Sequence, residues 1–265
     1  MKNVLIVCVN YNSYKELQSF IKSIDDSLYG VSGVLVKVVI ADNSSKYQQY
    51  SYTPNVELLS VEHRKCENDG YLGTAQKIIN AVEDIYQYDY VTISNVDIVV
   101  SRSFFSVLSQ IEIGDNIGWV VTAIKSESLG RDKNPSVLHR YSKLRLQILK
   151  LTYNSLILPL YEKLYYQKKI GLNYYGEMDI YAGHGAFMML TKAFFKRNRI
   201  INYPMFLYGE ELYLAELNRK ENLRVRYYPT LIINDLEHVS TSLLRRSSYY
   251  RYNRNALDYI LREFY

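Results

Sequence analysis

The fold of this chain is decided by the stretch Tyr90-Val91-Thr92-Ile93-Ser94-Asn95-Val96-Asp97, which the apolar Ile98-Val99-Val100 follows. The run from Tyr90 to Ser94 predicts a short buried strand that ends at Asn95 and Asp97. Open α/β sheets bind their ligands at the carboxyl ends of the strands. A carboxylate held there is costly unless it is solvated, paired or metal-bound. Asp97 therefore predicts a ligand site, and a divalent cation bridging a diphosphate would satisfy its charge.

Other apolar runs alternate with helical patterns on both sides of this stretch. Strands are expected at 4–9, 34–40, 56–61, 90–94, 119–124, 225–228 and 231–233, and helices at 15–27 and from Gly73 onward. This alternation predicts βαβ units and a mostly parallel sheet. Polar loops follow four of the strands: Asn10 to Asn12, Asp42 to Ser45, the loop before Asn68, and Asn95 to Asp97. Right-handed connections place these loops at one edge of the sheet, so their side chains should converge.

Composition narrows the class of protein. The 265 residues suit one large α/β domain, 48% of them are hydrophobic, and the net charge is +5. The positive charge is not gathered into one dense patch, so an anionic small ligand is a better partner than nucleic acid. The two cysteines, Cys8 and Cys66, have no metal-binding spacing, which argues against zinc and fits a reducing cytosol. No apolar run reaches the ~18 residues that span a bilayer, and the first one is too short for a signal peptide.

The segment 125–177 interrupts the strand–helix rhythm. Residues 138–169 are basic and apolar together, and Leu144, Ile148 and Leu151 fall on one helical face. Three interpretations stay open: a cover over the acceptor cleft buried within the protein, which is favoured slightly, an interface of a homodimer, or a surface that lies on a membrane. The basic and aromatic tail 245–265 would add to membrane attraction, meet a diphosphate, or form a solvated terminal helix. The expected location is the cytoplasm, with peripheral contact to the inner face of the cell membrane left open.

Seven short motifs in this order resemble those of the inverting family 2 glycosyltransferases with the GT-A fold, and within them the bacterial polysaccharide or rhamnosyl-type transferases. They are Val9-Asn10-Tyr11-Asn12-Ser13, Asp42-Asn43-Ser44-Ser45, Asn68-Asp69-Gly70-Tyr71, Ser94-Asn95-Val96-Asp97, Gly183-His184-Gly185-Ala186, Tyr208-Gly209-Glu210-Glu211, and His238 with Ser240 to Ser242. The resemblance runs from about Val4 to the tail and weakens in 125–177. Each motif alone is weak evidence, and the shared order is strong evidence.

The resemblance implies one GT-A domain over 1–265, with a Rossmann-like, mostly parallel sheet, helices on both faces and a small acceptor-side subdomain. Within it, 1–124 would be the half that binds the nucleotide-sugar, 125–177 a helical insertion, 178–244 the acceptor and catalytic half, and 245–265 the tail. Two departures from the family pattern matter. The usual DxD is Asn95-x-Asp97, which leaves one carboxylate for a metal, and the usual Glu-Asp pair is Glu210-Glu211.

Roles follow from the same resemblance. The donor site would use Asn10, Tyr11, Asn12, Asp42, Asn43, Asn68, Gly70, Tyr71, Asn95 and Asp97. Asp97 and His238 would bind Mg²⁺ or Mn²⁺. Glu211 would be the general base, with Glu210 bonding the acceptor or the backbone, although the sequence does not decide between the two. The plain alternatives are that Asn and Asp are ordinary turn residues and that the glutamates serve a helix N-terminus.

The expected activity is inverting transfer of a sugar from a nucleoside diphosphate sugar, TDP-rhamnose or a UDP-sugar, to a glycan or lipid-linked acceptor in bacterial polysaccharide synthesis. The alternative is a non-catalytic subunit that binds sugar nucleotides within a glycan assembly complex. A nucleotidyltransferase would need a glycine-rich basic loop after the first strand, where this chain has Asn10-Tyr11-Asn12-Ser13. The missing GxGxxG pattern counts against a nicotinamide enzyme.

Overall fold

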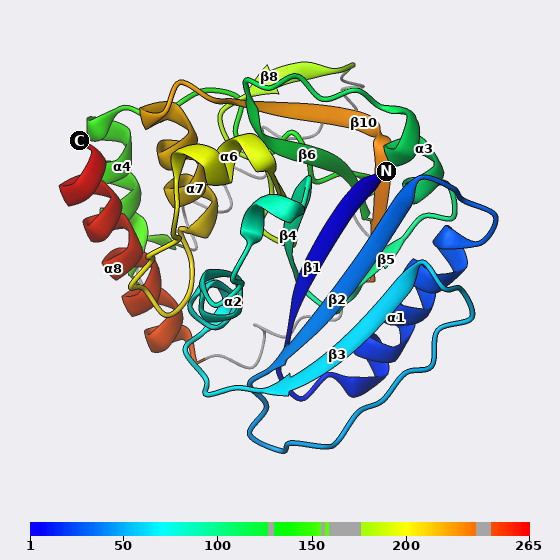
Figure 1. Ribbon diagram of the computed structural model, residues 1–265. Helices are drawn as coiled ribbons and strands as arrows, with labels where there is room; N and C mark the ends of the chain where they lie inside the picture. The colour runs from blue at the N-terminus through cyan, green and yellow to red at the C-terminus, as the bar shows by residue number, and fades with distance from the viewer. Residues whose placement is uncertain (127–129, 155–156, 159–175, 237–244) are drawn as a thin grey trace.

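A computed structural model describes residues 1–126, 130–154, 157–158, 176–236 and 245–265 (Figure 1). The described strands form one sheet in the order β3-β2-β1-β4-β9-β6-β10-β5, with β7 paired to β6 and β8 paired to β10. Their bounds are β1 Lys2–Asn10, β2 Val34–Asp42, β3 Leu59–Lys65, β4 Tyr90–Ser94, β5 Ile98–Val100, β6 Ile117–Ser126, β7 Arg131–Asp132, β8 Met178–Ile180, β9 Phe187–Thr191 and β10 Arg224–Asp235.

The sheet is mostly parallel, as the alternation of strands and helices predicts. Strands β3, β2, β1 and β4 pair in parallel, and so do β6 and β10. Strand β9 runs antiparallel to both β4 and β6, so the long strands on its two sides point the same way. The carboxyl ends of β1, β2 and β4 therefore meet at one edge, where Asn10 lies beside Asp42 in register.

Helices cover both faces of the sheet. Their bounds are α1 Tyr14–Leu28, α2 Tyr71–Asn80, the short 3-10 helix η1 Ile85–Gln87, α3 Phe104–Gln110, α4 Lys143–Thr152, α6 Lys192–Arg197, α7 Glu210–Lys220 and α8 Arg246–Phe264. Alternate residues of β1 point to opposite faces. Val4, Ile6 and Cys8 pack in the core with α1 and α3, whereas Leu5 and Val7 pack with α2, α6 and α7. The expected α/β class with two helical layers is thus confirmed.

Two expectations about strands were wrong. The third strand begins at Leu59 rather than at residue 56, because Val56 starts a turn in which its carbonyl accepts from the Leu59 N–H. The two strands expected around Pro229 form the single strand β10, since a bulge between Tyr228 and Ile232 absorbs the proline. Burial within the protein was favoured slightly for 138–169, of which 155–156 and 159–169 lie outside the described residues; in the described part Leu146 and Leu158 are buried, whereas Leu144, Ile148 and Leu151 are exposed. The part of the chain that is described contains no helix able to cross a membrane.

Candidate functional site

The loops after β1 and β2 are fastened to each other by side-chain amides. Asn10 is fully buried, and its side chain contacts the Ser44 hydroxyl and accepts from the Ser13 N–H. Asn12, with a positive φ of 59°, accepts from the Lys46 N–H. These amides, which the sequence places in the donor site, hold the two loops together. The Tyr11 side chain between them is 44% exposed, which leaves its ring available to a ligand.

Asp42 closes the end of β2 in a buried network. Its carboxylate accepts from the Tyr14 hydroxyl at 2.7 Å and from the Ser44 N–H at 3.0 Å, and His63 Nε2 lies 2.9 Å away. Burial raises the pKa of Asp42, but these hydrogen bonds outweigh burial and hold its pKa below the usual range. Tyr14 and His63 were missed from sequence, although His63 follows Val61 at strand spacing.

Asn43 ties β2 to the start of α2. Its side-chain amide nitrogen lies within 3.2 Å of Asn68 Oδ1 and of the Gly70 carbonyl, and 3.0 Å from Thr74 Oγ1. Asn68 Oδ1 also accepts from the Gly70 N–H. Asn43, Asn68 and Gly70 were predicted to lie in the donor site. The structure brings them together, and their mutual bonds build the wall of the site.

Gly70 lets a distant loop approach α2. It has a φ of +81°, and a Cβ placed on it would lie 1.6 Å from the Phe206 carbonyl oxygen. The loop held by this contact ends in Tyr208 and Gly209, which have φ values of 70° and 82° and precede α7. Glu210 and Glu211 form the first turn of α7. Close packing at Gly70 therefore sets where the glutamate pair begins.

The two glutamates lie in different surroundings. Glu210 is only 5% exposed, and burial first, with the charge of Glu211 second, raises its pKa to about 8. Glu211 is half-buried, and its Oε1 accepts from the Gly185 N–H at 3.1 Å. A Cβ on Gly185 would lie 2.5 Å from that oxygen, so a larger residue here would displace the Glu211 carboxylate from its present position. Burial therefore favours the protonated form of Glu210.

Tyr71 links these glutamates to Asp97. Its hydroxyl donates to the Gly185 carbonyl at 2.9 Å. Burial raises the pKa of Tyr71 well above its usual range, and the nearby charges of Glu210, Glu211 and Asp97 raise it further. The charges of all three carboxyl groups thus act on the Tyr71 hydroxyl, although the groups come from the end of β4 and the start of α7. Asn95 joins the same segment, because its N–H donates to the Ala186 carbonyl.

His184 lies beside this cluster as a neutral imidazole. Its Nδ1 accepts from the Ala186 N–H at 3.2 Å, which places the ring proton on Nε2. Burial lowers its pKa, against the opposing charge of Glu211. The His184 N–H donates to Asn134 Oδ1, so the backbone of this glycine-flanked turn is also fixed. A neutral Nε2–H is a hydrogen-bond donor suited to an oxygen of a substrate.

Of the two predicted metal ligands, Asp97 and His238, only Asp97 belongs to the described residues. His238 lies outside the described residues, and the described ones contain no group of three or more His, Cys, Asp or Glu that could hold a metal ion. Mg²⁺ commonly binds through one or two carboxylates completed by substrate phosphates. Asp97 follows β4 at the carboxyl edge, and its charge, like those of the glutamates, acts on Tyr71, which fits that kind of site.

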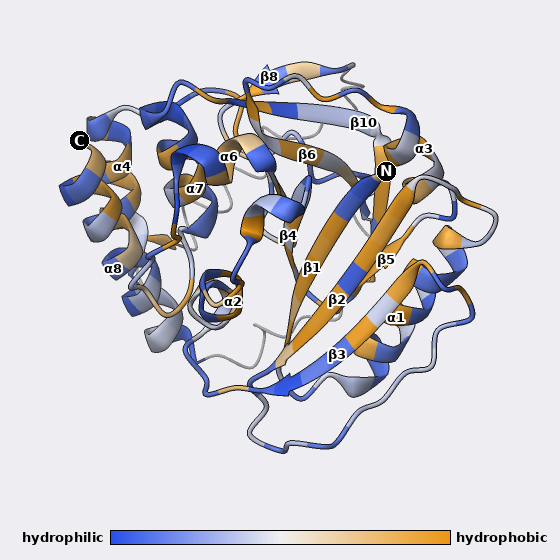
Figure 2. Ribbon diagram, viewed as in Figure 1, coloured by the Kyte–Doolittle hydropathy of each residue, from blue (hydrophilic) through white to orange (hydrophobic). Residues whose placement is uncertain are grey.

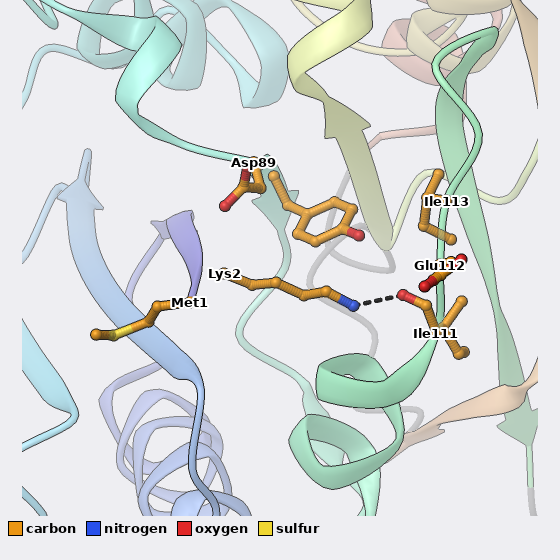
Figure 3. A pocket seen from close by; sticks show the side chains of 7 residues that line it. Met1, Lys2, Asp89, Ile111, Glu112 and Ile113 are labelled. Carbon is orange, nitrogen blue, oxygen red and sulfur yellow. Dashed lines mark hydrogen bonds between the residues drawn. The ribbon is translucent and has the colours of Figure 1, made fainter.

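A hollow lies at the edge of the sheet opposite to the carboxylate cluster, lined by residues that include Lys2, Asp89 and Glu112 (Figure 3). Lys2 Nζ bonds the carbonyls of Leu108 and Ile111 and so satisfies the end of α3. Lys2 and Asn10 stand at opposite ends of β1, about 26 Å apart at the rise of an extended strand. This hollow is separate from the carboxylate cluster.

Comparison with solved structures shows the fold. The chain resembles S. aureus TarS, a glycosyltransferase, with a TM-score of 0.51 and 15% identity over 88% of this chain. It resembles S. aureus TarS 1–349 in complex with UDP-GlcNAc with a TM-score of 0.53 and 14% identity over its full length. The chain spans 36% of the first TarS chain and 71% of the second. No protein-family model and no curated protein matches the chain.

Proposed function

We propose that this chain is an inverting glycosyltransferase that moves a sugar from a nucleoside diphosphate sugar to a hydroxyl of a glycan. The observation that carries the proposal is the arrangement of the two glutamates: Glu211 is held on the Gly185 N–H, while Glu210 is buried and has a pKa raised to about 8. A general base must keep its charge and be held in place. A TarS complex with UDP-GlcNAc supports this donor class through the shared fold.

In the proposed reaction, Glu211 takes the proton of the acceptor hydroxyl. The acceptor oxygen bonds to the anomeric carbon while the bond from that carbon to the phosphate oxygen breaks, so configuration inverts and the nucleoside diphosphate leaves. Mg²⁺ or Mn²⁺ at Asp97 would neutralise charge on the leaving diphosphate. Protonated Glu210 keeps a second negative charge away from the base. His184 would donate its Nε2–H to a sugar or phosphate oxygen.

The proposal extends to the donor, the nucleobase contact and the acceptor. A UDP-sugar is the first donor to test, because a TarS structure contains UDP-GlcNAc, and TDP-rhamnose is the second. Tyr11 would stack on the nucleobase, since it is an exposed aromatic residue in the loop after β1. The acceptor would be a growing bacterial glycan, free or linked to a lipid.

Two measurements test the proposal. Thermal shifts with UDP, TDP, GDP and ADP, each with and without Mn²⁺, should show a metal-dependent rise in Tm with UDP or TDP, because binding to the native state stabilises it by mass action. With the donor so found, Glu211→Gln should lower kcat for transfer or donor hydrolysis by about 100-fold or more while donor binding is kept. The matched variant Glu210→Gln should retain far more activity.

Other outcomes point elsewhere. Nucleotide binding without transfer or hydrolysis, in wild type and variants alike, would instead indicate the non-catalytic binding subunit. Retention of configuration in the product, measured by NMR, would exclude the single displacement. Activity that survives EDTA undiminished would remove the metal from the proposal.

A further inference from the structure

Helix α4 is apolar on two opposite sides. Leu146 is fully buried in the core against the neighbouring helix α8. On the outer side Leu144, Ile148 and Leu151 are 66%, 52% and 68% exposed. Spacings of four and three residues place these three on one face. A helix that borders water normally carries polar residues there, so this face requires an apolar partner.

The surroundings of this face are strongly basic. Residues 138–154 hold four Lys or Arg and no Asp or Glu, whereas the whole chain has a net charge of only +5. Lys143 and Arg145 flank Leu144 and are exposed. The neighbouring α8 carries four arginines against one aspartate and one glutamate. In Figure 2, hydrophobic and hydrophilic segments alternate along α4, which lies with α8 on the side of the molecule away from β3.

We propose that this face of α4 docks on an anionic lipid bilayer, with Leu144, Ile148 and Leu151 in the interface and Lys143 and Arg145 among the headgroups. Exposed leucines beside cations match such a surface, because apolar burial and attraction to anionic lipid add. Long basic side chains also extend to headgroups while their stems stay on apolar surface. A second copy of the chain fits worse, because a two-fold interface sets the basic patch against itself.

The docked helix would be rigidly joined to the glutamate pair. The hydroxyl of Ser142 caps the start of α4 by accepting from the Arg145 N–H, and Lys150 pairs with Asp258 of α8. At the other end, the Tyr153 ring contacts that of Tyr249 in α8, and Tyr249 contacts Tyr208, two residues before Glu210. Membrane docking at α4 would therefore hold the loop that precedes the glutamates at a fixed position relative to the bilayer.

Flotation of the whole chain with lipid vesicles tests this inference. We expect binding to vesicles of phosphatidylcholine with 30% phosphatidylglycerol, weaker binding to phosphatidylcholine alone, and loss of binding as salt rises. The triple variant Leu144→Gln/Ile148→Gln/Leu151→Gln should bind at least about tenfold more weakly, because glutamine keeps the helix propensity but not the apolar burial. Lys143→Glu/Arg145→Glu should weaken binding to the anionic vesicles by about tenfold or more.

Matched controls carry the same number of changes elsewhere. Tyr29→Gln/Leu35→Gln/Ile200→Gln removes three exposed apolar side chains, and Lys196→Glu/Arg199→Glu reverses two exposed charges near α6. Both should bind vesicles as wild type does, and Tm should show that all variants fold.

Several results would overturn the inference. They are no flotation with anionic vesicles, equal binding to both kinds of vesicle, or unchanged binding by the α4 triple variant. A wild-type dimer that the triple variant makes monomeric, seen by ultracentrifugation, would assign the face to a second copy. A large fall in Tm of the triple variant without any vesicle binding would assign it to the rest of the chain. The vesicles contain no sugar donor, so failure here leaves the proposed transferase activity to its own assays.

Discussion

Glu210 and Glu211 are neighbours in sequence, yet the helix turns their side chains into different environments. Glu210 points into the interior, where ionisation is costly, and Glu211 reaches the Gly185 N–H. The raised pKa of Glu210 limits the negative charge that builds up beside Glu211. The same arrangement makes the folded protein sensitive to pH around neutrality.

Glu210→Gln should stabilise the protein increasingly as pH rises. With a pKa raised to about 8, folded Glu210 keeps its proton at pH values where the unfolded chain, near the ordinary pKa of about 4.3, has released it. Wild-type stability therefore falls between about pH 4.5 and 8, and glutamine removes that dependence. We expect the Tm of the variant minus that of wild type to grow by about 3 °C or more from pH 5 to pH 8. Exposed Glu83→Gln is the control, and parallel curves for both variants would contradict this assignment.

Tyr11→Ala should weaken nucleotide binding with little effect on stability. Its ring is exposed at the carboxyl edge, and base–aromatic stacking contributes about 1–3 kcal/mol. Calorimetry with UDP should therefore show a Kd higher by about 5- to 150-fold. Tyr29→Ala, at the far end of α1 and 82% exposed, should leave the Kd unchanged. Equal Kd values for the two variants would remove Tyr11 from the site.

For single residues, the sequence indicated where the candidate catalytic and binding side chains lie. It did not indicate which hydrogen bonds each of them makes. Asp97 and the glutamates could be found because each follows a recognisable strand or loop. The partners of Asp42 could not, because Tyr14 and His63 meet it only through the pairing of β2 with β3 and the packing of α1. The hydrogen bonds that the side chains of Asn10 and Asn43 make likewise depend on which loops become neighbours in the fold. His238 lies outside the described residues, so its role stays a prediction.

Among the elements, the loop before α7 depends on a close backbone contact. A side chain at Gly70 would overlap the Phe206 carbonyl, and a positive φ adds strain for any residue with a Cβ. This contact places the beginning of α7 against α2 and thereby positions the glutamates.

Gly70→Ala should therefore lower both stability and activity. We expect a loss of more than about 2 kcal/mol in urea unfolding, since the overlap adds to the conformational strain. Gly30→Ala is the matched control, because Gly30 has a φ of +73° with open space around it and isolates the strain alone. If both variants unfold at the same urea concentration, the close contact with Phe206 does not contribute to the free energy of unfolding.

The pattern of elements was the most predictable level. Buried strands with polar ends and short crossovers dictate a parallel sheet, and that sheet is present. The helical spacing of Leu144, Ile148 and Leu151 predicted that they share one face of a helix. It did not predict what covers that face, because spacing determines which side chains align but not which surface packs against them. The start of β3 was misplaced for a related reason, since Val56 is apolar but belongs to a turn.

At the scale of the whole molecule, one buried carboxylate joins three distant segments. Glu216 of α7 is fully buried and bonds Arg140, the Tyr181 hydroxyl and Arg219. Arg140 also donates to the Phe264 carbonyl near the end of α8. This cluster fixes the segment before α4 to both helices, so it supports the position of α4 relative to the site.

Arg140→Met should destabilise the fold by about 2 kcal/mol. Removing one partner of a buried charge costs about 3–5 kcal/mol, and less is expected here because Arg140 is 35% exposed and Arg219 remains. Urea unfolding measures the change. The control Arg224→Met breaks an exposed pair with Asp179 and should cost no more than about 1 kcal/mol. Equal losses in the free energy of unfolding would show that the buried pair of Arg140 and Glu216 stabilises the fold no more than the exposed pair does.

The two cysteines differ sharply in solvent exposure. This difference would allow a fluorescent label to be placed next to the site. Cys8 is sealed in the core on β1, whereas Cys66 is partly exposed just after β3, where its N–H bonds the Asp42 carbonyl. Burial raises the pKa of both thiols, so labelling calls for mildly alkaline buffer, but only Cys66 admits a reagent. An environment-sensitive fluorophore would then attach at one position of the unmutated chain, and its emission would follow nucleotide occupancy in real time.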